Sequence, residues 1–232
     1  MIIINGKING KIIINGRVIG EGGTGKNQEF NRMHSEAAEN VEKITINSTF
    51  VDVNILASDS SIVETHFYGK ACIDGELDFD VQLVNRELKI SLKCIGNCYD
   101  NNLKIDVSLP RKTFKAISVT TSSANIILDE NIFTKQITIK TQSGELVSSA
   151  TFTDAHFSTM SGDVELCINP IEDIMVNITT MSGDVLACLD NVGHVKLSST
   201  TMSGNVRNLY KGNCGYTADM NIRTMSGDIN IK

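Results

Sequence analysis

The chain contains no tryptophan, only two prolines and few aromatic residues, and it has no long hydrophobic run. Its longest apolar runs, such as Ile12–Ile14, are three or four residues, whereas a membrane-spanning helix needs about 20. Basic residues are also few: 21 Lys and Arg against 27 Asp and Glu give a net charge of -6, with no basic cluster. The short apolar runs exclude a membrane-spanning helix. The acidic net charge and the lack of a basic cluster argue against a nucleic-acid partner.

What the chain does have is β-branched residues, with 29 Ile, 16 Val and 19 Thr among 232 residues. Such residues favour pleated strands, so the sequence predicts an all-β fold. Residues 1–7 lack a basic start followed by a long apolar stretch, which is the pattern of a secretory signal. We therefore expect a cytoplasmic location, with the cell surface possible through another export route.

The six cysteines and four histidines do not form a recognisable metal site. Cys94-x3-Cys98 is the only closely spaced pair, its partners elsewhere lack zinc-finger spacing, and the histidines are scattered. A domain of this size does not need a disulfide framework. The sequence therefore predicts no metal, no cofactor and mainly free thiols. Cys167 and Cys188 each follow a repeat glycine by five residues, so we expect them to stack on the outer face.

An internal repeat organises the second half of the chain. A six-residue pattern, Thr-Met-Ser-Gly-Asp/Asn-Val/Ile, occurs four times, and two weaker copies precede it. The copies are Thr121–Ile126, Thr141–Leu146, Thr159–Val164, Thr180–Val185, Thr201–Val206 and Thr224–Ile229.

The repeat length predicts a β-solenoid. Successive marker positions, Gly or Ala124, are 20, 18, 21, 21 and 23 residues apart, which fits one solenoid coil or a leucine-rich repeat. No Leu-x-x-Leu-x-Leu pattern occurs, and the flanks alternate with period two, as in Val176-x-Ile178-x-Thr180. We predict coils of a strand, a bend at Ser-Gly, a second strand and a return loop. Val, Ile, Thr and Ser should point inward, with the hydroxyls bonded to the backbone.

The Gly and Asp or Asn of each copy are predicted to form the bends. Glycine permits a backbone that a Cβ would oppose, and the following Asp or Asn can bond nearby amides. A calcium site on the stacked carboxylates is the alternative, but Asn interrupts the column and the nine-residue calcium repeat is absent. The predicted turn positions are Gly144, Gly162, Asp163, Gly183, Asp184, Gly204, Asn205, Gly227 and Asp228.

The methionine of each full copy lies between Thr and Ser, so alternation points it outward. Stacked coils would then align four methionines in an apolar stripe about 15 Å long. Exposed Met-rich strips are typical of adaptable binding surfaces. The alternative is that another segment covers them. The candidate interaction stripe is Met160, Met181, Met202 and Met225.

With these repeats, the chain resembles the bacterial β-strand-repeat family of unknown function labelled "putative adhesin". The resemblance covers roughly residues 41–232 and rests mainly on the repeated T-x-S-G-D-[VI]. Ile44–Ile46, Val51–Val53, Leu88–Ile90 and Ile105–Pro110 fit the same pattern. It implies a right-handed, single-stranded parallel β-helix and supplies no catalytic residues.

The two ends of the chain have sequence patterns that differ from those of the central repeats. Asn-Gly pairs between short apolar runs in residues 1–19 favour tight hairpins, and residues 20–40 are polar. We expect a hairpin element and polar linker over residues 1–40, followed by a solenoid over residues 41–232. The last repeat is followed by only three residues, so residues 217–232 should form an open end that supports weak homodimerisation.

These observations predict a non-catalytic structural or interaction module that binds protein or glycan along its outer faces. No Ser-His-Asp arrangement and no converging carboxylate pair indicates catalysis. Two alternatives remain: a glycan-processing enzyme on the same fold, and a cytosolic self-assembling scaffold. A cleft of converging acidic and basic residues would favour the enzyme, and a flat stacked face would favour the binding module.

Overall fold

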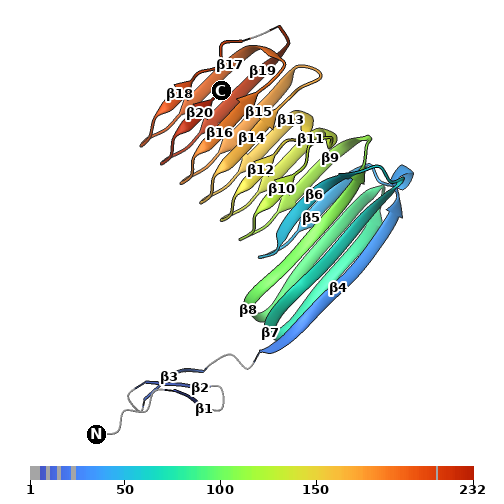
Figure 1. The fold of residues 1–232 in the computed structure, drawn as a ribbon, viewed down its shortest axis with the longest axis vertical. Coiled ribbons are helices and arrows are strands. Elements are labelled where there is room, and N and C mark those ends of the chain that lie inside the picture. Colours follow the sequence, from blue (N-terminus) through green and yellow to red (C-terminus); the bar gives the residue numbers. More distant parts are fainter. Residues whose placement is uncertain (1–5, 9–10, 15–16, 22–24, 213) are drawn as a thin grey trace.

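The structure is a computed structural model that describes residues 6–8, 11–14, 17–21, 25–212 and 214–232. Within these residues all regular secondary structure is β-strand, apart from one short 3-10 helix at Ala38–Asn40. No helix in these ranges is long and apolar enough to cross a membrane. The all-β prediction is therefore confirmed, and the parallel stacking gives a solenoid-like sheet (Figure 1).

The stack consists of two hydrogen-bonded layers, which we call layer A and layer B. The order of strands in layer A is residues 76–84 of β7 (Ile62–Val84), residues 87–91 of β8 (Glu87–Pro110), β5 (Lys43–Asn47), β9 (Thr113–Thr120), β11 (Phe133–Lys140), β13 (Thr151–Ser158), β15 (Ile174–Thr179), β19 (Tyr216–Arg223) and β17 (Val192–Thr200).

Layer B follows the same path on the other side of the core. Its order is β4 (Lys26–Ala37), residues 62–73 of β7, residues 102–110 of β8, β6 (Asp52–Ser58), β10 (Ile126–Leu128), β12 (Leu146–Ser148), β14 (Val164–Ile168), β16 (Val185–Leu189), β20 (Ile229–Ile231) and β18 (Val206–Asn208). In each coil a layer A strand passes through a bend into a layer B strand.

Period-two alternation fills the space between the layers. In layer A, Ile117, Ile137, Ala155 and Val176 lie in register on successive strands, and all are essentially fully buried. The layer B strands add a facing column that includes Val164. Burying an aliphatic side chain contributes about 1.5–3 kcal/mol, so these columns dominate the stability of each coil.

Five of the six repeat threonines are buried as predicted, and Thr201 is half-buried. The hydroxyls of Thr121, Thr141 and Thr201 donate to backbone carbonyls as predicted. Those of Thr159, Thr180 and Thr224 have no hydrogen-bond partner, and neighbouring threonines, about 4.8 Å apart, are too far away to bond one another. The prediction of inward serines is wrong. The repeat serines are exposed, for example Ser161 and Ser182, because the chain bends there and the strand alternation stops.

A long folded hairpin closes the N-terminal end of the stack. Strands β7 and β8 pair antiparallel along nearly their whole length, and both bend where Gly75 lies opposite Gly96. Both glycines have positive φ, and a Cβ on Gly75 would lie 1.9 Å from the Ile95 carbonyl oxygen. The bend brings Phe67 of layer B onto Phe79 of layer A, with ring centroids 4.8 Å apart. One hairpin thus supplies strands to both layers.

Residues 26–37, which we expected in a polar linker, instead form β4, the edge strand of layer B. β4 pairs antiparallel with β7 over its full length, from Lys26 opposite Ile73 to Ala37 opposite Ile62. Phe30 anchors it, with its ring 5.4 Å from that of Phe67. Upstream, β1 (Gly6–Ile8), β2 (Lys11–Ile14) and β3 (Arg17–Glu21) form a separate antiparallel sheet. The Asn-Gly pairs at 9–10 and 15–16 lie outside the described residues.

The last coil in sequence is not the last coil in space. β19 pairs with β15 on one side and β17 on the other, and β20 lies between β16 and β18. The same order holds at the bends, where Ser226 bridges Ser182 and Ser203. The prediction that residues 217–232 form the open end is therefore wrong: this coil is internal, and β17 and β18 form the end. The chain advances two strand spacings after β16, and its last coil fills the gap.

Candidate interaction face

The repeat methionines line one narrow side of the stack, where layer A bends into layer B. Each follows a threonine, which is buried in all copies except the half-buried Thr201, and precedes an exposed serine. Because the C-terminal coil is inserted, their spatial order differs from their sequence order. Along the stack they are Met160, Met181, Met225 and Met202, with exposed fractions of 52%, 44%, 48% and 79%.

No described segment covers the methionine stripe, so its side chains are available to a partner. Neighbouring members lie about 4.8 Å apart, because each occupies the same position of an adjacent parallel strand. Met202 is the most exposed because its coil has a neighbour on one side only. The stripe is therefore a continuous thioether surface that ends at the β17–β18 coil.

Glycines make the bend behind this stripe unusually tight. A Cβ on Gly162 would lie 2.1 Å from the Gly144 carbonyl oxygen, and one on Gly183 would lie 2.1 Å from that of Gly162. Gly227 and Gly204 meet the same obstruction from the glycine carbonyl of their neighbouring coil. The stacked bends thus leave no space for side chains, which explains why this position carries glycine in five of six copies.

A ladder of Asp and Asn side chains follows the glycines. The backbone N–H of Asp184 donates to the Asp163 carboxylate at 2.8 Å, and that of Asp228 donates to the Asp184 carboxylate at 2.7 Å. The N–H of Asn205 donates to Asp228 at 2.7 Å. Each carboxylate therefore fixes the next coil by a charge-assisted hydrogen bond. This bonding needs no cation, and no group of three or more His, Cys, Asp or Glu in the described ranges could hold a metal.

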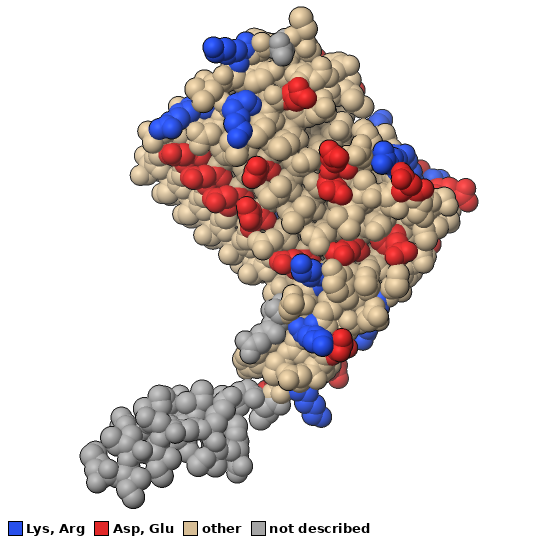
Figure 2. Space-filling model, in the orientation of Figure 1, with Lys and Arg blue, Asp and Glu red and all other residues tan. Residues whose placement is uncertain are grey.

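The ladder gives the methionine stripe an acidic border. Figure 2 shows a diagonal row of acidic side chains along one side of the molecule. Asp163 and Asp184 are exposed, and Asp228 is half-buried. An apolar ridge beside a row of carboxylates suits a partner that carries both apolar and basic side chains.

Cys167 and Cys188 lie in register on β14 and β16, as their spacing predicts. Both are free thiols in the structure, as are the other four cysteines. Burial raises the pKa of the Cys188 thiol, and the neighbouring Cys167 raises it further, so Cys188 is a neutral thiol at pH 7. They line an open groove of roughly 750 Å³ formed with the return loops, which also contains Asp190 and Lys232.

The sequence reasoning missed the coil order, although one signal could have found it. The step from Gly204 to Gly227 is the longest, at 23 residues. The extra length lies in residues 209–215, between β18 and β19, where the chain reverses its direction along the stack. The expected cytoplasmic location stays a prediction.

Comparison with known proteins supports the fold described above. The family model described as "Toastrack DUF4097" matches residues 41–232. The crystal structure of a "putative cell adhesion protein" from Clostridium sporogenes has a TM-score of 0.56 at 15% identity, covering 88% of this chain and 99% of that chain. A "putative adhesin" from Bacteroides fragilis has a TM-score of 0.40 at 13% identity, covering 88% and 97%.

A "putative lipid binding protein" from Parabacteroides distasonis has a TM-score of 0.38 at 16% identity, covering 87% of this chain and 96% of that one. No curated protein matches the sequence. The expected family of β-strand repeats with "putative adhesin" members is confirmed, because the matching model covers every strand of the two layers except β4. The chain belongs to the Toastrack family, DUF4097.

Proposed function

We propose that the chain is a non-catalytic interaction module that binds another protein through the methionine stripe and its acidic border. The observation that carries this proposal is the run of four exposed methionines at one strand spacing, uncovered by any described segment. Methionine is flexible and polarisable, so such a surface adapts to a partner without a preformed pocket. The carboxylate row beside it selects for basic side chains and steers their approach.

A protein partner fits this face better than a glycan. Sugar rings are commonly held by flat aromatic side chains, and the chain has no Trp and only four Tyr. The exposed apolar residues at the bends are methionines, which contact apolar side chains well but offer no hydrogen bonds to hydroxyl groups. The partner we propose is an extended segment that alternates apolar and basic residues.

The arrangement of carboxylates supports a binding role over glycan processing. A glycosidase places two carboxyl groups on opposite sides of a bond, about 5–9.5 Å apart. Here the aspartates lie in a single row along a ridge, and the oxygens named above accept backbone hydrogen bonds. The aspartates therefore hold neighbouring coils together and make this side of the surface acidic.

We also propose that the regular coils, of about 20 residues each, wind right-handedly from β9 to β16. Parallel β-strand crossovers are right-handed in about 98% of cases. The step from β18 back to β19 runs in the opposite direction along the stack, so it would carry the opposite hand.

A synthetic peptide tests the proposed function. The probe is a fluorescein-labelled 12-residue peptide of alternating Leu and Lys, and the readout is fluorescence anisotropy. We expect binding that weakens at least tenfold in the double variant Met181→Ser and Met225→Ser, because two adjacent apolar contacts are lost. A peptide of alternating Leu and Glu should bind more weakly than the Lys peptide.

Met175→Ser is the matched control, because Met175 is 53% exposed but lies on layer A, away from the stripe. This variant should bind the Lys peptide like the unmodified chain. Equal affinity of the stripe variant and the unmodified chain, or equal loss in the control, would overturn the proposal.

A further inference from the structure

The β17–β18 coil leaves the end of the core open. In layer A, β17 pairs only with β19, and in layer B, β18 pairs only with β20, among the described residues. Val195 and Leu197 pack against the core but are only half-buried, whereas their register partners Ala218 and Met220 are fully buried. The Val192 carbonyl accepts a hydrogen bond from the Tyr210 hydroxyl. The rest of this edge presents unpaired backbone groups beside incompletely covered apolar side chains.

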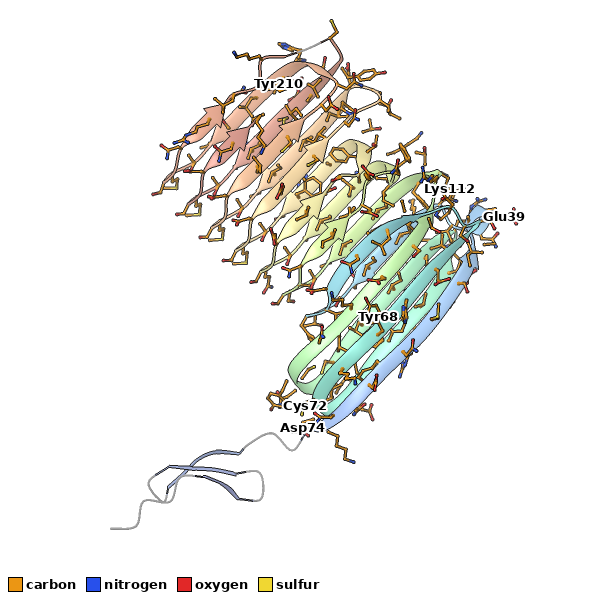
Figure 3. The ribbon with its side chains drawn as sticks, in the orientation of Figure 1. Glu39, Tyr68, Cys72, Asp74, Lys112 and Tyr210 are labelled. Carbon is orange, nitrogen blue, oxygen red and sulfur yellow. The ribbon has the colours of Figure 1, made fainter. Side chains whose placement is uncertain are left out.

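The opposite end of layer A has the same character. Residues 76–84 of β7 pair with β8 on one side and with no described strand on the other. Leu77, Phe79, Val81 and Leu83 point toward the core and are half-buried. Figure 3 places Tyr210 at the β17 end and Asp74 at the folded tip of β7 and β8, at opposite ends of the stack.

These two ends carry opposite charge. Residues 191–218 contain three basic residues, Lys196, Arg207 and Lys211, and no Asp or Glu. Residues 71–84 contain four acidic residues and no Lys or Arg; they are Asp74, Glu76, Asp78 and Asp80. Within the described residues, the ion pairs involve none of these side chains.

We propose that the β17 end binds the β7 edge of a second copy of this chain, so that copies stack head to tail and layer A continues from one to the next. The strand directions fit, because β17 runs parallel to the first residues of β8, and β7 runs antiparallel to them. Residues 192–200 and 76–84 are both nine residues long and would pair antiparallel. Because β4 extends layer B one strand beyond β7, the second copy must tilt so that its β4 lies next to β18 and not in its place.

The residue pattern and the equal lengths of the two segments together favour one register for this pairing. Aligning residue 192 with 84 and residue 200 with 76 places Lys196 opposite Asp80, and Leu197 opposite Phe79. Both charged side chains are exposed, and both apolar ones face the core. A shift of one residue would put charged side chains opposite apolar ones, so alternation disfavours it.

Charge also disfavours the other ways of joining two copies. Two β17 ends would bring basic residues together, and two β7 edges would bring acidic residues together, so like ends repel. Acidic residues on an exposed edge suppress indiscriminate pairing while allowing a basic partner. Because the two binding surfaces differ, the contact is heterologous and extends into an open chain of copies.

Charge reversal at each end tests this inference by sedimentation velocity. At about 20 mM salt we expect the unmodified chain to form a concentration-dependent series of oligomers that dissociates at 0.5 M salt. In the proposed register, Lys196→Glu places two acidic side chains opposite each other, and Asp80→Lys places two basic ones opposite each other. Each variant alone should self-associate at least tenfold more weakly, and an equimolar mixture should assemble again.

Lys135→Glu is the control, because Lys135 is exposed on β11 in the middle of the stack, and it should assemble like the unmodified chain. Circular dichroism confirms that each variant is folded before sedimentation. A monomer at every concentration up to 1 mM would overturn the inference. So would equal effects of Lys196→Glu and Lys135→Glu, or a mixture that stays as dissociated as its components.

Discussion

Replacing Gly183 with alanine is expected to destabilise the folded chain by about 3–5 kcal/mol, enough to leave much of it unfolded. A Cβ at this position would lie 2.1 Å from the carbonyl oxygen and 2.7 Å from the carbonyl carbon of Gly162. Both obstructing atoms belong to the backbone, so no side-chain rotation relieves the overlap. The two coils would have to separate, which breaks bonds such as that from Gly162 N to Ser182 O, now 3.0 Å.

Ala124→Gly is the matched control for this substitution. Ala124 occupies the marker position of the first repeat copy, where its Cβ faces the bend at residues 48–51, which carries no marker glycine. Removing it should change stability by no more than about 1 kcal/mol, mainly through the added freedom of glycine. Urea unfolding followed by circular dichroism measures both variants. Native-like stability of Gly183→Ala would refute the stacked-bend geometry.

Met220→Asp is expected to have the second large effect, a loss of at least about 3 kcal/mol or a failure to fold. Met220 is fully buried on β19 because β15 and β17 flank it on both sides. An aspartate there would place a carboxylate in the apolar core, where no cation could pair with it.

Leu197→Asp provides the comparison, because Leu197 is the register partner of Met220 on the terminal strand β17. It is half-buried and one of its sides faces solvent, so its replacement should cost about 1 kcal/mol. Thermal unfolding of both variants decides between the two coil orders. A larger loss for Leu197→Asp than for Met220→Asp would contradict an internal C-terminal coil.

The sequence predicts the stacking well because the residues of each repeat copy determine which side chains point inward and where the chain bends. Alternation places Val176 and Ile178 in the core and keeps Met181 outside it. The repeat glycine indicates that neighbouring bends approach closely, because only a residue without a Cβ fits between them. These local rules act within one coil and its neighbours, so a single sequence reveals them.

The order of the coils depends on interactions that local rules do not contain. Each repeat copy has the same inward pattern, so the Thr201 and Thr224 coils fit either position equally well on alternation alone. The choice depends on packing: the fully buried Ala218 and Met220 suit an internal coil, and Val206 and Asn208 suit an exposed end. That difference becomes visible only when the two coils are compared in register.

The N-terminal strands were missed for a different reason. β4 carries Arg32, His34 and Glu36 on the side that faces the core, and such polarity favours a linker over a strand. Polar and charged residues are common on the inward side of edge strands, where they discourage further pairing. Edge position, which the sequence does not disclose, makes this composition compatible with a strand.

The candidate face could be predicted only in part. The sequence indicates which methionines share a column, and the structure adds their order and the carboxylate ladder that borders them. The sequence shows that residues 71–84 are acidic and residues 191–218 are basic. Only the structure shows that each segment includes an open edge of the stack.

The order of the methionines along the stripe and the identity of the open end both depend on the internal position of the C-terminal coil, and engineered disulfides test that position most directly. In a background with all six cysteines replaced by serine, cysteines are introduced at exposed positions in pairs. Thr179 and Arg223 are register neighbours on β15 and β19, about 4.8 Å apart, whereas Thr179 and Thr200 are two strands apart, about 9.6 Å. A disulfide requires Cα atoms closer than about 7 Å.

Mild oxidation followed by mass spectrometry should detect a disulfide in the Thr179→Cys and Arg223→Cys variant, and free thiols in the Thr179→Cys and Thr200→Cys variant. The opposite result, a disulfide joining residues 179 and 200 and none joining 179 and 223, would show that the coils stack in sequence order.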